Sequence, residues 1–256
     1  MFKTCVMSGK GGVGKSTIAT QLAIGLANLG YDVGLVDLDV EGPNITRMLG
    51  IMDKKLEASP IHTKPYIYSP HLKVVSVASH PCITGNNPLV WTGKSHAKYV
   101  HIIMDNVDWG HLDHMVFDFP PGTGDAVMGL WETFEADGIV LVSAPSKLST
   151  DNCELVIKVA HKLKAPILGL VENFSCFICE CNRKHYIFGE SNAKALAEKY
   201  NIKFYGEIPL LTELSSAFDN GKPYVFPLIY EVIDDIVSKN KSTYSKVAEV
   251  FQMLRR

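Results

Sequence analysis

Short apolar runs alternate along the chain with longer stretches of helical periodicity. The runs are rich in Val, Ile and Leu and contain no regular polar alternation, which is typical of strands that are buried on both faces. They cover residues 4–7, 33–36, 74–77, 115–117, 139–142, 167–171 and 204–208. Strands that alternate with helices in this way predict an α/β fold, a doubly wound and mostly parallel sheet with helices on both faces.

The first helix is predicted directly after the first run. An apolar stripe at helical spacing runs through Ile18, Leu22, Leu26 and Leu29. Gly30 follows at the position where such a helix is expected to end, because glycine readily adopts the left-handed conformation of a helix terminus.

Three further segments have a predicted structure. A helix is expected over residues 151–163, with its N-cap at Ser149, Thr150 or Asp151. Residues 53–70 hold three prolines and mixed charge, which favours an excursion loop. Residues 243–255 place apolar side chains at helical spacing and predict a C-terminal helix that docks on the rest of the chain.

Length and composition narrow the choice of function. A chain of 256 residues that is 46% hydrophobic suits one globular domain, residues 1–256. Its formal net charge of −2 gives no field to attract nucleic acid or anionic lipid, and no stretch reaches the ~20 apolar residues of a membrane span. Because the first residues also lack the pattern of an export signal, we expect a cytoplasmic protein with no nucleic-acid and no membrane partner.

A glycine-rich segment links the first predicted strand to the first predicted helix. It consists of Gly9, Lys10, Gly11, Gly12, Val13, Gly14, Lys15, Ser16 and Thr17. Its glycines let the backbone curl so that successive N–H groups point inward, and these amides form an anion site with the helix N-terminus. We expect Lys15 to lie along the β- and γ-phosphates of ATP, Ser16 to bind Mg²⁺ and Thr17 to reach the α-phosphate. The chain is therefore predicted to be a P-loop ATPase.

A second lysine, Lys10, stands just inside the first glycine, which makes this the deviant form of the Walker A loop. In ATPases that carry this form, the equivalent lysine reaches across a dimer interface to the nucleotide of the partner. Lys10 therefore predicts a homodimer that ATP closes, and the alternative is an ordinary solvated surface lysine.

Carboxylates follow two of the predicted strands. Asp39 comes after the second strand, where it is placed to orient the attacking water or to steady Mg²⁺. Asp118 ends a later strand and fits the Walker B role of holding Mg²⁺ through water, and the turn at residues 120–124 suits a switch that senses the γ-phosphate. Asp37 and Asp125 have an alternative role as helix-cap or turn acids.

Three cysteines, Cys176, Cys179 and Cys181, lie within six residues. A closed iron–sulfur or zinc site normally takes four ligands, so two chains that each give two cysteines complete one site at the symmetry axis of a homodimer. Spacing alone favours Cys176 with Cys179 as the pair. Zn²⁺ remains an alternative to an iron–sulfur cluster, because thiolates at this spacing suit either.

Together these motifs resemble the Mrp/ApbC family of P-loop ATPases, relatives of MinD and ParA that act as carriers of iron–sulfur clusters. The resemblance covers nearly the whole chain. The residues that carry it are 9–17, 37–43, 107–110, 118–125, 168–175, 186–189 and 206–209. It implies a homodimer in which two cysteines from each subunit hold a 4Fe–4S cluster for transfer to apo-proteins, together with cluster assembly factors. It further implies that Asn173 contacts adenine and that the loop at Pro209 closes over the base.

The chain departs from the family pattern at the cysteines. Family members usually have Cys-x-x-Cys followed by glycine, and here the segment is one residue shorter. Alignment with the family places Cys179 at the first ligand position and Cys181 near the second, within an insertion at about residues 174–189. Cys179 is a ligand on either pairing, and its mate stays open.

Two other functions compete with cluster transfer. One is a MinD- or ParA-like positioning ATPase, which leaves the cysteines unexplained. The other is an ATPase dimer that a structural zinc site fastens.

Overall fold

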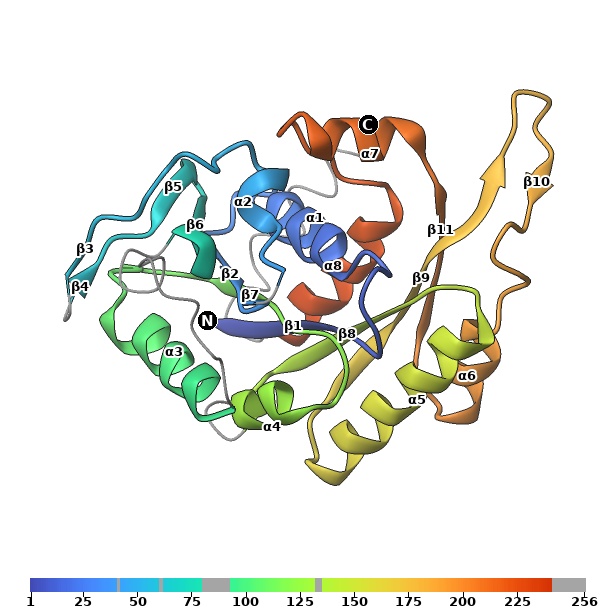
Figure 1. Ribbon diagram of the computed structural model, residues 1–256, viewed down its shortest axis with the longest axis horizontal. Helices are drawn as coiled ribbons and strands as arrows, with labels where there is room; N and C mark the ends of the chain where they lie inside the picture. The colour runs from blue at the N-terminus through green and yellow to red at the C-terminus, as the bar shows by residue number, and fades with distance from the viewer. Residues whose placement is uncertain (41, 60–61, 80–92, 132–134, 241–256) are drawn as a thin grey trace.

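The computed structural model describes the chain except at residues 41, 60–61, 80–92, 132–134 and 241–256 (Figure 1). Within the described residues, nine strands form one sheet in the order β10-β9-β8-β1-β7-β2-β6-β5, and β11 pairs with β9. The strands are β1 (Phe2–Ser8), β2 (Val33–Asp37), β5 (Tyr66–Ser69), β6 (Leu72–Ser76), β7 (His114–Asp118), β8 (Gly138–Ser143), β9 (Ile167–Ile178), β10 (Lys184–His185) and β11 (Phe204–Leu210). A separate pair consists of β3 (Ala58–Ser59) and β4 (His62–Thr63).

Helices cover both faces of this sheet, as the alternation of strands and helices predicts (Figure 1). They are α1 (Lys15–Asn28), α2 (Ile45–Met48), α3 (Gly93–Asn106), α4 (Asp125–Trp131), α5 (Lys147–Lys162), α6 (Ala193–Lys199), α7 (Thr212–Asp219) and α8 (Leu228–Lys239). None of the helices in the described part of the chain combines the length and the apolar character that crossing a membrane requires.

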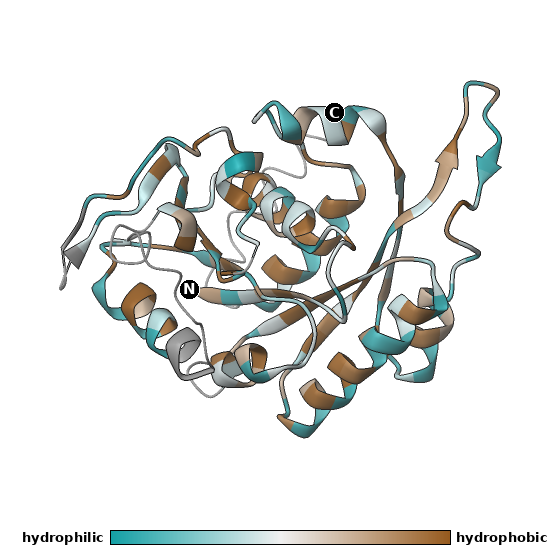
Figure 2. Cartoon of the chain, viewed as in Figure 1, coloured by the Kyte–Doolittle hydropathy of each residue, from teal (hydrophilic) through white to brown (hydrophobic). Residues whose placement is uncertain are grey.

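Two hydrophobic cores lie on opposite faces of the sheet. Successive residues of a strand point to opposite faces, so Val6 of β1 joins the core under α1 and α8, and Met7 joins the core under α3, α4, α5 and α6. Figure 2 shows the brown apolar sides of these helices turned toward the sheet. The central strands are buried on both faces, which confirms the fold predicted from their continuous apolar runs.

The predicted start of the second helix is wrong by one turn. α5 begins at Lys147, and its N-cap is Ser146, whose hydroxyl accepts a hydrogen bond from the backbone N–H of Ser149. The apolar stripe fails to reveal this turn because its one large apolar residue, Leu148, is 63% exposed. By contrast, α1 ends at Asn28 and Gly30 adopts a φ of 84°, as the sequence predicts.

Two further differences concern strands. The segment predicted as a loop at residues 53–70 contains β3, β4 and β5, because β5 finds a partner by pairing antiparallel with β6 at the edge of the sheet. β9 extends to Ile178, well beyond the predicted run at 167–171, so that Cys176 lies in a strand. The helix predicted at residues 243–255 lies outside the described residues.

The parallel pairing brings the carboxyl ends of several strands to one edge. β1 pairs parallel with β7 and β8, and β2 pairs parallel with β6 and β7. The glycine-rich loop after β1 therefore lies beside the acids at the ends of β2 and β7, because ligands bind at this edge of an open α/β sheet. The fold thus gathers the predicted phosphate loop and the predicted carboxylates in one place.

A contact between two glycines joins the ends of α2 and α7, which flank this edge. A Cβ atom built on Gly221 would lie 2.4 Å from the Cα atom of Gly50, and both residues have positive φ values, 64° and 67°. No side chain fits there without separating the two helices.

Gly221→Ala is expected to destabilise the fold by about 2–4 kcal/mol, because it adds a backbone clash to the cost of a left-handed residue. Gly30→Ala is the matched control: its φ is also positive, 84°, but its Cβ would meet open space. The control is expected to lose only about 1–2 kcal/mol. Urea unfolding of both variants measures the difference, and equal losses would contradict a role for the glycine contact.

Candidate nucleotide site and cysteine hairpin

The loop between β1 and α1 requires glycine at several positions. Gly12 and Gly14 have φ values of 79° and 84°, which side-chain-bearing residues rarely adopt. A Cβ on Gly9 would lie 2.2 Å from the carbonyl carbon of Asn152 in α5, and one on Gly14 would lie 2.1 Å from Nδ2 of Asn173. The loop is therefore packed directly between α5 and β9.

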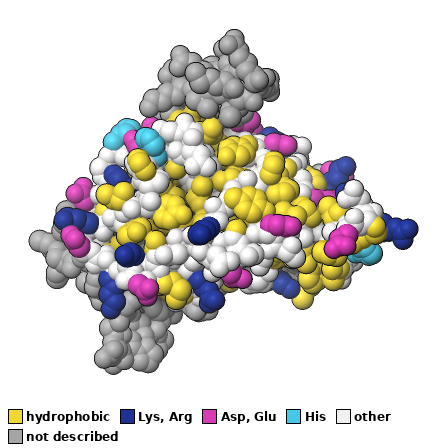
Figure 3. Space-filling model, turned by 90° about the horizontal axis from the view of Figure 1, so that it is seen from above, with side chains coloured by type: hydrophobic (Ala, Val, Ile, Leu, Met, Phe, Trp, Pro, Cys, Tyr) yellow, Lys and Arg dark blue, Asp and Glu magenta, His cyan; other side chains and the backbone are white. Residues whose placement is uncertain are grey.

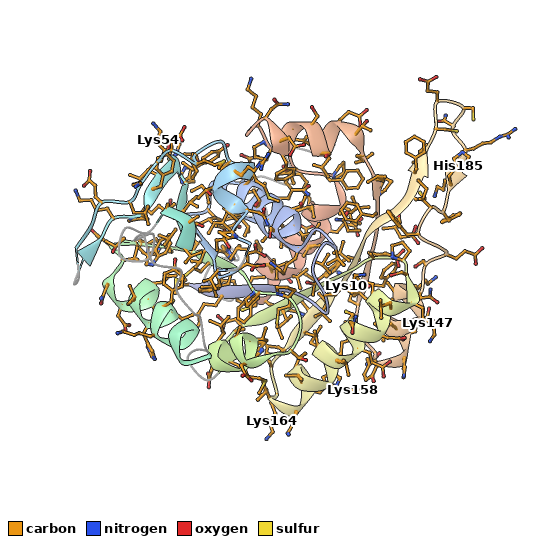
Figure 4. The ribbon with its side chains drawn as sticks, viewed as in Figure 1. Lys10, Lys54, Lys147, Lys158, Lys164 and His185 are labelled. Carbon is orange, nitrogen blue, oxygen red and sulfur yellow. The ribbon has the colours of Figure 1, made fainter. Side chains whose placement is uncertain are left out.

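A cavity of about 290 Å³ opens over this loop. Most of the predicted nucleotide-binding residues line it: Lys10, Gly11, Gly12, Gly14, Lys15, Ser16, Thr17 and Asp39. Figure 4 labels Lys10 on the loop between β1 and α1, where its side chain is half-buried. Residues that are more than twenty positions apart in the sequence therefore lie at one cavity in the structure.

Five further residues line the cavity. Pro121 belongs to the turn predicted to sense the γ-phosphate, and no role was predicted for Ser8, Asn44, Met48 and Phe174. Asn44 is the N-cap of α2 and Met48 is its last residue, one helical turn later. Both follow the loop that carries Asp39. A helix directly after an acid at a strand end is a sequence signal that could have identified them. Phe174 comes from β9, far along the chain, and only the folded structure reveals its position.

A buried ion pair lies at the base of the cavity. The Lys15 ammonium donates a hydrogen bond of 2.6 Å to Oδ1 of Asp118 and lies 3.6 Å from Oδ2 of Asp39. Although burial alone would lower the pKa of Lys15, the Asp118 carboxylate raises it above its ordinary value, so the amine remains charged. Oδ2 of Asp118 is buried and makes no hydrogen bond, which leaves one acceptor free for a hydrated cation.

Asp37 organises the loop that carries Asp39. Its carboxylate accepts hydrogen bonds from the backbone N–H groups of Asp39 and Ile45 and from the Ser76 hydroxyl. Because Ile45 opens α2, these are the contacts of a cap and turn acid. Burial, together with the nearby Asp118 carboxylate, raises the pKa of Asp37 to about 8. Asp125 begins α4 and is exposed, so it lies in the first turn of a helix.

The two residues expected near adenine lie outside the lining of the cavity. Asn173 is buried, and its side-chain amide donates a hydrogen bond of 3.0 Å to the carbonyl oxygen of Val13 in the phosphate loop. Pro209 lies in β11 and is half-buried. Contact of either residue with the base stays a prediction.

The cysteine segment forms a hairpin that projects from the body (Figure 1). β9 runs out to Ile178, and β10 returns antiparallel to it, with Lys184 opposite Ile178 and His185 opposite Phe177. Ile187 and Phe188, which follow β10, are more than half exposed, and Figure 3 shows hydrophobic side chains gathered at this end of the molecule.

The hairpin brings two of the three cysteines together. The Sγ atoms of Cys179 and Cys181 lie 2.8 Å apart at the turn, whereas Cys176 is buried in β9 beside the Ser175 hydroxyl. The sequence leaves the mate of Cys179 open, and in the structure its thiol neighbour is Cys181. In the described part of the chain, no three His, Cys, Asp or Glu side chains are grouped so that they could hold a metal ion.

The environment of Cys179 favours its thiolate. A hydrogen bond from Cys181, and next a hydrogen bond from His185, lower the pKa of Cys179 to about 6. Figure 4 labels His185 on the hairpin, where the pairing of β10 with β9 positions it. Sequence reasoning missed His185 because its contact depends on the hairpin register.

Comparisons with known proteins agree on one family. The family model described as "ParA: NUBPL iron-transfer P-loop NTPase" matches residues 2–249. An "iron-sulfur cluster carrier protein" of Pyrococcus abyssi is 33% identical, over 94% of this chain and 87% of its own length. A "cytosolic Fe-S cluster assembly factor NUBP2 homolog" of Dictyostelium discoideum is 36% identical, over 87% of this chain and 86% of its own.

Solved structures show the same fold. A nucleotide-binding protein of Archaeoglobus fulgidus in complex with ADP superimposes with a TM-score of 0.77 at 35% identity, and the match covers 91% of each chain. The cell division protein MinD of Aquifex aeolicus superimposes with a TM-score of 0.62 over 92% of this chain and 95% of MinD. At 20% identity, the likeness to MinD shows the fold alone.

The pKa of Cys179 predicts the pH dependence of its alkylation. Only the thiolate reacts, and a lowered pKa means that the thiolate is present above pH 6 and is lost as the pH falls below it. In cluster-free protein, the rate of reaction of Cys179 with iodoacetamide, followed by peptide mass spectrometry, is expected to rise with a midpoint near pH 6. In Cys181→Ala the midpoint is expected to move toward the ordinary thiol value of about 8.5. An ordinary midpoint in the unaltered protein would contradict this assignment.

Proposed function

The chain belongs to the NUBPL iron-transfer family of P-loop NTPases, and from this premise we propose that it is an ATP-hydrolysing carrier that transfers 4Fe–4S clusters to apo-proteins as a homodimer. Residues 1–256 would act as one ATPase domain with a cysteine-bearing insertion at about residues 174–189. The observation that carries the proposal is the pairing of Cys179 with Cys181 on a hairpin whose strand β9 also contributes Phe174 to the lining of the nucleotide cavity.

The nucleotide site has the groups that ATP hydrolysis needs. The backbone amides of the loop and the charged Lys15 amine supply positive charge where the phosphates would lie. The Ser16 hydroxyl and the free oxygen of Asp118 fit a hydrated Mg²⁺, which would neutralise charge on the β- and γ-phosphates. Asp39 lies 3.6 Å from Lys15 and lines the same cavity, where it is placed to orient the attacking water.

The cysteine pair supplies half of a cluster site. One chain presents two adjacent thiols, and a 4Fe–4S cluster takes four thiolate ligands. A second copy of the chain supplies the missing pair when the hairpins meet across a two-fold axis. The cluster is then cargo at an interface, and opening the dimer releases it to an apo-protein. A zinc ion would fit the same four thiolates, so metal content is part of the test.

The test of cluster transfer compares two cysteines with different surroundings. Cys179→Ala is expected to bind and hydrolyse ATP normally but to lose cluster transfer to an apo-ferredoxin by at least tenfold. The reason is that even changes beside metal ligands typically cost about 10–100-fold in metal affinity. Cys176→Ala is the matched control, because Cys176 is buried in β9 and is expected to keep transfer.

Transfer is followed by visible absorbance after anaerobic reconstitution, with iron and zinc counted. Normal transfer by Cys179→Ala would contradict the proposal. A colourless protein that holds stoichiometric zinc would favour a structural site instead.

Lys10 is proposed to close the dimer on ATP. Its half-buried side chain lines the cavity, and a second copy that approaches the phosphate loop would meet its exposed part. Lys10→Ala is expected to weaken the ATP-bound dimer by about 2–5 kcal/mol, since it removes a charge from a phosphate contact at the interface. Sedimentation velocity with Mg-ATP measures the change. Lys54→Ala, at an exposed lysine away from the cavity, is the control, and equal dimerisation of the two variants would exclude this role for Lys10.

A further inference from the structure

The nucleotide cavity and the cysteine hairpin share one strand. Asn173 of β9 is hydrogen-bonded to the phosphate loop at Val13, and Phe174 lines the cavity. A Cβ on Gly14 would lie 3.4 Å from the tip of the Phe174 ring, so the ring lies against the point where the loop opens α1. Cys179 follows on the same segment. Any displacement of Phe174 therefore occurs within a few residues of the thiol pair.

The strand is irregular where it passes the cavity. β9 and β11 pair at Asn173 with Ile208 and again at Phe177 with Leu210. Between these pairs β11 has only Pro209, whereas β9 has Phe174, Ser175 and Cys176. β9 therefore bulges, and proline offers no N–H to tie the bulge to the neighbouring strand.

Phe174 holds an unfavourable backbone conformation inside this bulge. Its φ is 59°, in the left-handed region that residues with a side chain seldom occupy. Such residues cost about 1–3 kcal/mol and persist where their surroundings enforce them, often at ligand sites. The ring of Phe174 lies near Gly14 and lines the cavity, so a ligand in the cavity is placed to hold this conformation.

The base of the hairpin is fixed on both arms. The Glu172 carboxylate, fully buried in β9, accepts hydrogen bonds from the Ser191 hydroxyl and the backbone N–H of Ala193, at the start of α6. The Asn192 side chain donates to the carbonyl oxygen of Pro145. Both arms are therefore anchored beside the bulge, so we expect a change in the bulge to act on the hairpin more than on the rest of the sheet.

We propose that Phe174 is a positioning residue that couples nucleotide in the cavity to the Cys179–Cys181 pair, through the bulge at residues 174–176. A nucleotide that fills the cavity fixes the ring, restrains the bulge and thereby holds the thiol pair in one arrangement. An empty cavity leaves the ring free to move, and the strained backbone then relaxes toward an extended conformation. The functional meaning of this coupling rests on the proposed cluster transfer, because it regulates the cluster ligands.

The experiment measures alkylation of cluster-free protein by isotope-coded iodoacetamide, read at Cys179 and Cys181 by peptide mass spectrometry. Rates are compared without nucleotide and with a non-hydrolysable ATP analogue plus Mg²⁺, at saturation judged from the binding curve of each variant. All proteins carry Lys10→Ala and are diluted until the rates no longer depend on concentration. This design removes shielding of the thiols by a second copy and leaves the coupling within one chain.

Nucleotide is expected to slow alkylation of both thiols by at least about fivefold, the lower end of typical coupling between sites. Phe174→Ala is expected to bind the analogue, but its alkylation rates with and without the analogue are expected to be equal. Phe188→Ala is the matched control, because it removes the same ring from an exposed position outside the cavity lining, and it is expected to keep the full difference.

Three results would overturn the proposal: a full nucleotide effect in Phe174→Ala, no nucleotide effect in the parent protein, or complete loss of nucleotide binding by Phe174→Ala. If the alanine variant does not fold, Phe174→Leu replaces it. Leucine fills part of the space without the ring, so its nucleotide effect is expected to be smaller than that of the parent, and an undiminished effect would again overturn the proposal. Because no cluster is present, these outcomes are independent of whether the protein transfers one.

Discussion

The buried charge of Lys15 is the constraint on which the nucleotide site depends. An ammonium at 6% exposure is costly unless carboxylates compensate it, and Asp118 and Asp39 do so from the ends of different strands. Those carboxylates can reach it only because β1, β2 and β7 run parallel and end at the same edge. Asp37 adds no direct contact to the amine. It holds the backbone that places Asp39, so the loop and the sheet are fixed by one network of charges and hydrogen bonds.

That network explains why the nucleotide site was the most predictable part of the molecule. The spacing of Gly9, Gly14 and Lys15 constrains the backbone so tightly that few other structures fit it, and Gly9 and Gly14 indeed meet Asn152 and Asn173. The alternation of buried runs likewise predicted the parallel sheet, because central strands carry their own signal in apolar residues. Both features are local in sequence or repeated along it.

The features that sequence missed depend on partners that are distant or on side chains that face solvent. β5 is an edge strand whose residues are partly exposed, so its pairing with β6 leaves no continuous apolar run. The first turn of α5 carries the exposed Leu148 and therefore lies outside the apolar stripe. The mate of Cys179 was left open by the sequence, because cysteine spacing favoured Cys176 and alignment with the family favoured Cys181. The neighbour of Cys179 in the structure depends on where β9 ends and on the register that sets His185 opposite Phe177, and cysteine spacing contains neither fact.

One strand that serves two sites has a mechanical consequence. A regular strand in the middle of a sheet is hydrogen-bonded to its neighbours at every second residue. A force on one residue is therefore shared by the whole sheet, and the displacement of any one strand is small. The outer half of β9 is less tied to its neighbours. There β11 faces the bulge with a proline, and the other strand that pairs with β9 is the short, exposed β10. The segment from Phe174 to Cys179 is thus held at its base by Glu172 and is paired again from Phe177 onward, whereas residues 174–176 have no pairing partner in β11. A ligand that acts on the ring of Phe174 therefore acts on the part of β9 that β11 does not pair with, a few residues before the thiols.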